Sequence, residues 1–171
     1  AINYYKKTIT IDSNDAKAYY NIGVSYDKLG NDTQAINYYQ KAIVINPNYA
    51  EVYYDMGNSY ANLSNYTQAI SYYKKAITID SNDAEAYYNI GVSYDKLGNY
   101  TQAISYYQKA ITVNPNDAEA YYNMGNSYAK LGNDTQAISY YQKAITVNPN
   151  YGNAYYNMGN SYAKLGNDTQ A

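Results

Sequence analysis

The sequence repeats with a period of 34 residues, and this period limits the fold more than any other feature. Residues 16–49, 50–83, 84–117 and 118–151 align without a gap, and the third and fourth of these units differ at five positions. A fixed period of this length is typical of repeat proteins, in which each unit is one supersecondary element that packs on its neighbours. We therefore expect an array of similar units and not one globular core.

Each unit carries two apolar stripes at helical spacing. In the first unit the first stripe consists of Tyr19, Ile22, Gly23 and Tyr26, and the second of Ala35, Ile36, Tyr39, Ala42 and Ile43. The sequence Leu29-Gly30-Asn31 breaks the pattern between them. The second stripe stops at a proline or a serine, because proline cannot continue a helix; these residues are Pro47, Pro115, Pro149, Ser13 and Ser81. The pattern predicts two short antiparallel helices in each unit.

The order of residues within the unit resembles the tetratricopeptide repeat (TPR) family over the whole chain. An aromatic residue, an aliphatic-glycine pair and a tyrosine in the first helix precede small alanines around a second aromatic residue and a terminal proline. Tyrosine stands at both aromatic places, where tryptophan and phenylalanine are commoner in the family. The resemblance implies an all-α fold, a TPR α-solenoid in which antiparallel helix hairpins form a right-handed superhelix. We expect complete repeats at 16–49, 50–83, 84–117 and 118–151, the second helix of a partial repeat at 1–15, and the first helix of another at 152–171.

A glycine interrupts the first helix of every unit, at Gly23, Gly57, Gly91, Gly125 and Gly159. Glycine inside a helix costs roughly 1 kcal/mol relative to alanine. We expect close approach of the two helices of a hairpin as the reason, with Ala35 or its copy opposite the glycine. The tyrosines should then wedge between successive hairpins.

The composition removes most of the residues that build active sites. The chain has 29 Tyr and 24 Asn but no His, Cys, Phe or Trp, and all 12 of its basic residues are lysines. Zinc, haem and iron–sulfur ligand sets and Cys-His or Ser-His nucleophile pairs therefore cannot form. We expect no catalytic residue, no metal site and no cofactor. A net charge of −2 without arginine argues against nucleic acid as a partner, and no stretch approaches the ~20 apolar residues of a membrane span.

The turn between the two helices is the first candidate functional surface. Each turn holds an N-x-T motif, the acceptor sequence for N-glycosylation, and covalent glycans would be attached at Asn31, Asn65, Asn99, Asn133 and Asn167. The alternative is structural, because asparagine is a good helix N-cap and Gln34 completes a capping box with Asn31. Capping explains the asparagine and the glutamine but not the threonine. The two interpretations are compatible, since a glycan occupies the amide nitrogen and the cap uses the amide oxygen.

The second candidate surface is the concave groove that first helices line in TPR proteins. The resemblance places in it the pairs Tyr20 and Asn21, Tyr54 and Asp55, Tyr88 and Asn89, Tyr122 and Asn123, and Tyr156 and Asn157. An asparagine ladder can form hydrogen bonds with an extended peptide backbone without reading its side chains. For the tyrosines, packing between neighbouring first helices is an equally good explanation.

The register of the two ends suggests continuation of the array. Ala1 and Ala171 occupy the same place in the unit, so the chain starts at a second helix and stops as another begins. The favoured hypothesis is a non-enzymatic scaffold, and more specifically a segment of an extracellular, N-glycosylated fibre in which the chain itself is the end-to-end partner. A cytoplasmic adaptor that binds a peptide of a partner protein is the alternative. The regulatory arm of an enzyme whose catalytic domain lies elsewhere is a third hypothesis.

Overall fold

The structure, a computed structural model, describes residues 1–166, which form ten α-helices and no strand. The chain divides into two compact units, Ala1–Asn82 and Asp83–Ala171. The first unit contains α1 (Ile2–Ile11), α2 (Ala16–Asp27), α3 (Asp32–Ile45), α4 (Ala50–Asn62) and α5 (Tyr66–Ile79). The second contains α6 (Ala84–Lys96), α7 (Tyr100–Val113), α8 (Ala118–Lys130), α9 (Asp134–Val147) and α10 (Gly152–Lys164).

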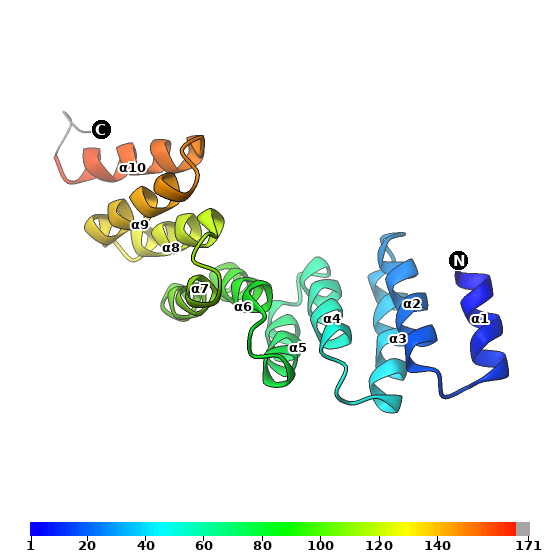
Figure 1. Cartoon of the computed structure of the whole chain (residues 1–171). Coiled ribbons are helices and arrows are strands. Elements are labelled where there is room, and N and C mark those ends of the chain that lie inside the picture. The colour runs from blue at the N-terminus through cyan, green and yellow to red at the C-terminus, as the bar shows by residue number, and fades with distance from the viewer. Residues whose placement is uncertain (167–171) are drawn as a thin grey trace. The chain divides into compact units, whose positions relative to one another are not determined.

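The helices pair into hairpins within each unit. In the first unit α2 lies beside α3 and α4 beside α5, while α1 packs on α2 and α3 packs on α4 (Figure 1). In the second unit the pairs are α6 with α7 and α8 with α9, and α9 also contacts α10. The predicted hairpins are thus confirmed, and the first helices of neighbouring repeats, such as α8 and α10, also touch.

Asparagine caps start the second helix of each complete hairpin. The side-chain oxygens of Asn31, Asn65, Asn99 and Asn133 accept hydrogen bonds from the backbone N–H three residues later, at 3.1–3.3 Å. The residue before three of these asparagines is a glycine with a φ of 72–75°, a conformation that disfavours residues with a Cβ. These four asparagines therefore act as helix N-caps, as the capping interpretation predicted.

A buried tyrosine from the second helix fills the centre of each hairpin. Tyr39, Tyr73, Tyr107 and Tyr141 are at most 2% exposed, and their rings lie against the mid-helix glycines of the first helix. A Cβ added at Gly91 would lie 2.6 Å from two ring carbons of Tyr107. We expected Ala35 or its copy to be the nearest neighbour of the glycine, but the nearest atoms belong to the tyrosine ring. The alanines are buried nearby, but the tyrosine ring occupies the space.

Gly91→Ala should destabilise the second unit. The new methyl group must displace the Tyr107 ring, which is 1% exposed and has no free space to enter. Overpacking should outweigh the better helix propensity of alanine and lower the free energy of unfolding by about 1–2 kcal/mol. Chemical denaturation measures this change.

Gly152→Ala is the matched control for this substitution. Gly152 is also helical, but no atom lies within 4 Å of an added Cβ, and the other repeats carry alanine at this place. This variant should be as stable as the wild type or slightly more stable. Equal stability of the Gly91→Ala variant and the wild type would show that the tyrosine ring does not require the glycine.

Candidate functional site: the first-helix face

Three of the five tyrosines predicted to line the groove form a hydrogen bond with the next repeat. The Tyr20 hydroxyl donates to Asp55 Oδ2 at 2.9 Å. In the second unit the direction is reversed, because Asn123 Nδ2 donates to the Tyr88 hydroxyl at 2.8 Å and Asn157 Nδ2 donates to that of Tyr122 at 3.0 Å. These bonds join first helices of neighbouring repeats. The packing explanation therefore accounts for the hydroxyl groups of Tyr20, Tyr88 and Tyr122.

The other predicted groove residues differ in exposure. Tyr54, Asn21 and Asn89 are half-buried, whereas Tyr156 on α10 is 71% exposed. Of the ten residues predicted for the groove, Asn157 alone borders the pocket described next.

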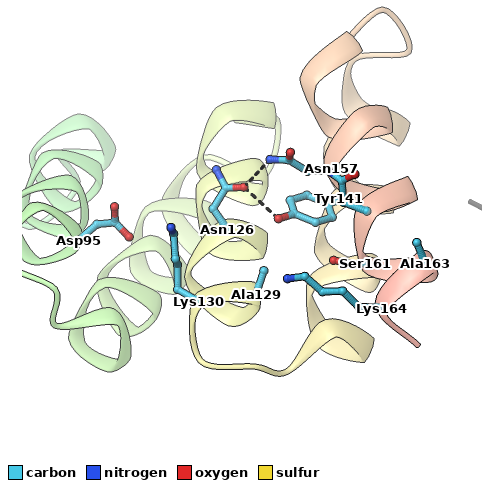
Figure 2. Close-up of a pocket in the computed structure, with 10 residues that line it drawn as sticks. Asp95, Asn126, Ala129, Lys130, Tyr141, Asn157, Ser161, Ala163 and Lys164 are labelled. Carbon is cyan, nitrogen blue, oxygen red and sulfur yellow. Dashed lines mark hydrogen bonds between the residues drawn. The ribbon is translucent and has the colours of Figure 1, made fainter. Parts of the chain in front are cut away.

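A pocket of about 660 Å³ lies on the first helices of the second unit, between α8 and α10 (Figure 2). Its polar border consists of Asn126, Lys130, Tyr141, Asn157, Asn160 and Lys164, with Asp95 of α6 at one side. Two alanines, Ala129 and Ala163, form part of its wall. Asp27 and Asp95 stand at the same place in two other repeats, so the small side chains of these alanines leave the hollow open.

Hydrogen bonds fix the orientation of two pocket amides. Asn126 Oδ1 accepts from the Tyr141 hydroxyl and from Asn157 Nδ2, both at 2.9 Å (Figure 2). Asn157 Nδ2 thus donates both of its hydrogens, to Asn126 and to the Tyr122 hydroxyl. The Asn157 Oδ1 atom remains as an acceptor. The exposed Asn160 side chain makes no hydrogen bond with another of residues 1–166.

Two lysines and one carboxylate give the pocket its charge. Lys164 Nζ lies 3.6 Å from Asp134 Oδ1, and the Lys164 side chain is 59% exposed. Lys130 is exposed and forms no ion pair within the described part of the chain. Asp95 Oδ1 accepts a hydrogen bond from the Ser127 hydroxyl at 3.0 Å. The pocket therefore presents amides and ammonium groups on a rigid helical surface.

Sequence analysis missed Asn126, Asn160 and the two lysines. The signal was present as a spacing, because Asn123, Asn126 and Lys130 occupy positions i, i+3 and i+7 of one helix, and Asn157, Asn160 and Lys164 repeat this spacing in the next first helix. Such residues share one helix face. The predicted groove stopped at the first member of each series.

Sequence profiles of the tetratricopeptide repeat match residues 16–49, 84–117 and 118–151, and a second profile of this name matches 38–71 and 140–171. A profile described as TPR repeat matches residues 57–98. The chain belongs to the tetratricopeptide repeat family. TPR proteins are generally scaffolds for protein interaction, and a scaffold role is supported for this chain.

Solved structures of TPR proteins confirm the all-α solenoid fold class. The MamA protein is 31% identical, with a TM-score of 0.87 over 91% of this chain and 85% of that chain. YrrB, described as a TPR protein with an unusual peptide-binding site, is 28% identical, with a TM-score of 0.86 over 99% and 88%. MamA from Desulfovibrio magneticus RS-1 is 26% identical, with a TM-score of 0.84 over 90% and 87%. Comparison with curated proteins by sequence gives no match.

The turn asparagines of the TPR hairpins are exposed. Asn31, Asn65, Asn99 and Asn133 use the amide oxygen for capping, and their amide nitrogens form no hydrogen bond within residues 1–166. Asn167, the fifth predicted glycosylation site, lies outside the described residues. The geometry is therefore compatible with a cap and with a modified nitrogen at the same residue.

Within residues 1–166, no helix is both long enough and apolar enough to cross a membrane. The same part of the chain contains no group of three or more acidic side chains that could hold a metal ion.

Asp55 is the one carboxylate in a position that carries asparagine in the other TPR repeats, at Asn21, Asn89, Asn123 and Asn157. Burial, with smaller contributions from the nearby Asp27 and Glu51, raises the pKa of the Asp55 carboxyl from 3.8 to about 6. The hydrogen bond from Tyr20 opposes this effect. Ionisation of Asp55 therefore costs more free energy in the folded state than in the unfolded state, although the carboxyl is mostly ionised at neutral pH.

Asp55→Asn should stabilise the first unit at neutral pH. Because the folded-state pKa lies above the unfolded-state value, Asp55 contributes stability that is fully present below pH 3.8 and is lost as the pH rises through about 6. Asparagine can still accept the Tyr20 hydrogen bond without a charge. The free energy of unfolding at neutral pH should rise by on the order of 1–3 kcal/mol, and the loss of stability between the two pKa values should disappear.

Denaturation curves across this pH range test the prediction, with Asp80→Asn as control. Asp80 is exposed, and Asn46, Asn114 and Asn148 stand at its place in other repeats. The control removes the same charge and should keep the wild-type pH profile. Identical profiles for Asp55→Asn and the wild type would contradict the role assigned to burial.

Proposed function

We propose that this chain is a TPR scaffold that binds an extended segment of a partner protein along the first helices of its second unit. The observation that carries the proposal is the pair of oriented amides, Asn126 and Asn157, beside the side chain of Asn160, which forms no hydrogen bond within residues 1–166. Within these residues Asn160 offers both a donor and an acceptor, as a peptide group does, and Asn157 offers its Oδ1 acceptor. These groups can pair with the backbone of an extended chain of any sequence.

The pocket size and the fixed side chains support this function. A volume of about 660 Å³ lies within the range of ligand pockets, and its border is formed by helices and not by loops. Asn126 and Asn157 are held before a ligand arrives, so binding requires little ordering of the protein. YrrB, to which the chain is similar, is described as having a peptide-binding site.

A display library of random linear peptides would test the proposal. Peptides should be enriched on the whole chain, and one selected peptide should then be titrated against variants. Asn160→Ala together with Asn157→Ala should weaken its binding about tenfold, as expected for the loss of one or two hydrogen bonds. Circular dichroism would show whether the helices are retained, because Asn157 also bonds Tyr122.

Asn153→Ala is the matched control on the same helix. Asn153 is exposed at the start of α10 and does not border the pocket. This variant should bind the selected peptide like the wild type. A library without enriched peptides, or full affinity in the Asn157 and Asn160 variants, would refute the groove as a peptide site.

A second candidate function is structural: a stretch of a longer extracellular array with N-linked glycans at the turns. The exposed turns favour it, because the cap uses only the amide oxygen of each N-x-T asparagine. Sugars at Asn31, Asn65, Asn99 and Asn133 would then project from the hairpin ends. The two functions use different surfaces of the hairpin.

Mass spectrometry of the protein from its native source tests this candidate. We expect hexose-containing additions on peptides that include the turn asparagines and none on the peptide with Asn114, which is exposed but followed by Pro115. Electron micrographs of the same material should show filaments. An unmodified mass and discrete particles would leave the peptide-binding scaffold as the function.

A further inference from the structure

We infer that the pocket of the second unit selects a peptide with acidic side chains, whose carboxylates are bound by Lys130 and Lys164. The inference rests on the proposed peptide-binding function and adds the charge of the ligand. These two lysines are not among the ten residues predicted for the groove. The amides would bind the peptide backbone, and the lysine ammonium groups would select the side chains of the peptide.

The two lysines stand beside the amides on adjacent helices. Each lies seven residues after the first asparagine of its series, Lys130 after Asn123 on α8 and Lys164 after Asn157 on α10. Figure 2 shows the Lys164 side chain extending from α10 toward Ala129 of α8, and Lys130 between Asp95 and Asn126. A peptide held by the amides would therefore pass both ammonium groups.

The ammonium groups retain donors for a ligand. Each carries three N–H donors. Lys130 has no ion pair among residues 1–166, and the pair of Lys164 with Asp134 is long, at 3.6 Å, with a Lys164 side chain that is 59% exposed and an Asp134 side chain that is 11% exposed. Asp95 is the one carboxylate on the pocket border, and its Oδ1 atom already accepts from Ser127.

The charge of the pocket differs from that of its surroundings. The whole chain carries a net charge of −2, whereas two lysines and one aspartate border this pocket. Lysine also stands at this place in two other repeats, at Lys28 and Lys96, whereas Asn62 occupies it in the repeat at 50–83 and donates from Nδ2 to Asp32 Oδ1 at 2.9 Å. A local positive site on an acidic protein favours anionic partners and excludes cationic ones. Asp95 would repel the doubly charged phosphate of a phosphopeptide more than a single carboxylate.

Matched fluorescent peptides would test the inference by anisotropy. One peptide alternates Glu and Ser, a second has Gln in place of Glu, and both have amidated ends; a third is the Gln peptide with a free C-terminal carboxylate. The display-selected peptide serves as the reference ligand. The Glu peptide should bind about tenfold more tightly than the Gln peptide at low salt, and added salt should reduce this difference.

Single substitutions assign the effect to the pocket. Lys130→Gln and Lys164→Gln should each weaken binding of the Glu peptide severalfold and leave the Gln peptide unchanged. Lys143→Gln is the control, because it removes the same charge from α9, where the Lys143 ammonium lies 4.4 Å from the centre of the Tyr140 ring. This variant should bind both peptides like the wild type.

Three outcomes would overturn the inference: equal binding of the Glu and Gln peptides, equal losses in all three lysine variants, or binding of the free-terminus peptide alone. In each case continued binding of the selected peptide would leave the proposed peptide-binding function intact. Failure of any peptide to be selected would instead refute that function and the inference with it.

Discussion

Each helical hairpin depends on contact between a buried tyrosine ring of its second helix and a glycine in its first helix. The ring brings a hydroxyl group into the packed layer, and this hydroxyl needs a partner. Tyr73 donates to Asn58 Oδ1 at 2.7 Å, and Tyr141 donates to Asn126 Oδ1 at 2.9 Å. The core therefore fixes the orientation of amides on the first-helix face. A phenylalanine core would leave Asn126 without this bond.

Two kinds of repeat follow from this requirement. The repeats at 16–49 and 84–117 have valine and aspartate at the places where the others have asparagine and alanine. In the first of these repeats Val24 packs against the cluster that contains Tyr39. The Tyr39 hydroxyl is buried and has no hydrogen-bond partner among the described residues. Asp95 of the first kind accepts from Ser127 of the following repeat. The pocket occurs where two repeats of the second kind are adjacent, because alanine replaces the aspartate in both.

The period and the stripes were sufficient to predict the helices, the hairpins and the family, because these depend on residue spacing. The period and the stripes did not predict which atoms are in contact. Gly91 was expected to face an alanine, and a tyrosine ring lies there, since both residues occupy the same apolar stripe. The groove tyrosines lie on first helices, but the hydroxyl groups of Tyr20, Tyr88 and Tyr122 form hydrogen bonds between repeats. Which polar group remains available depends on the neighbouring repeat, and the pattern of one unit does not contain that information.

The tyrosine hydroxyl also explains how near-identical repeats can carry different charges. It donates to a carboxylate in the pair of Tyr20 with Asp55 and accepts from an amide in the pair of Tyr122 with Asn157, while the helices keep the same arrangement. A hydroxyl can do both because it has one donor and two acceptor sites. Aspartate and asparagine are therefore interchangeable for the link between repeats but not for the surface charge. The same holds for Asn62 and Lys164, which bond Asp32 and Asp134 at equivalent places. Tyrosine, glycine and alanine thus hold the hairpins constant, and the polar positions beside them set the surface charge of each repeat.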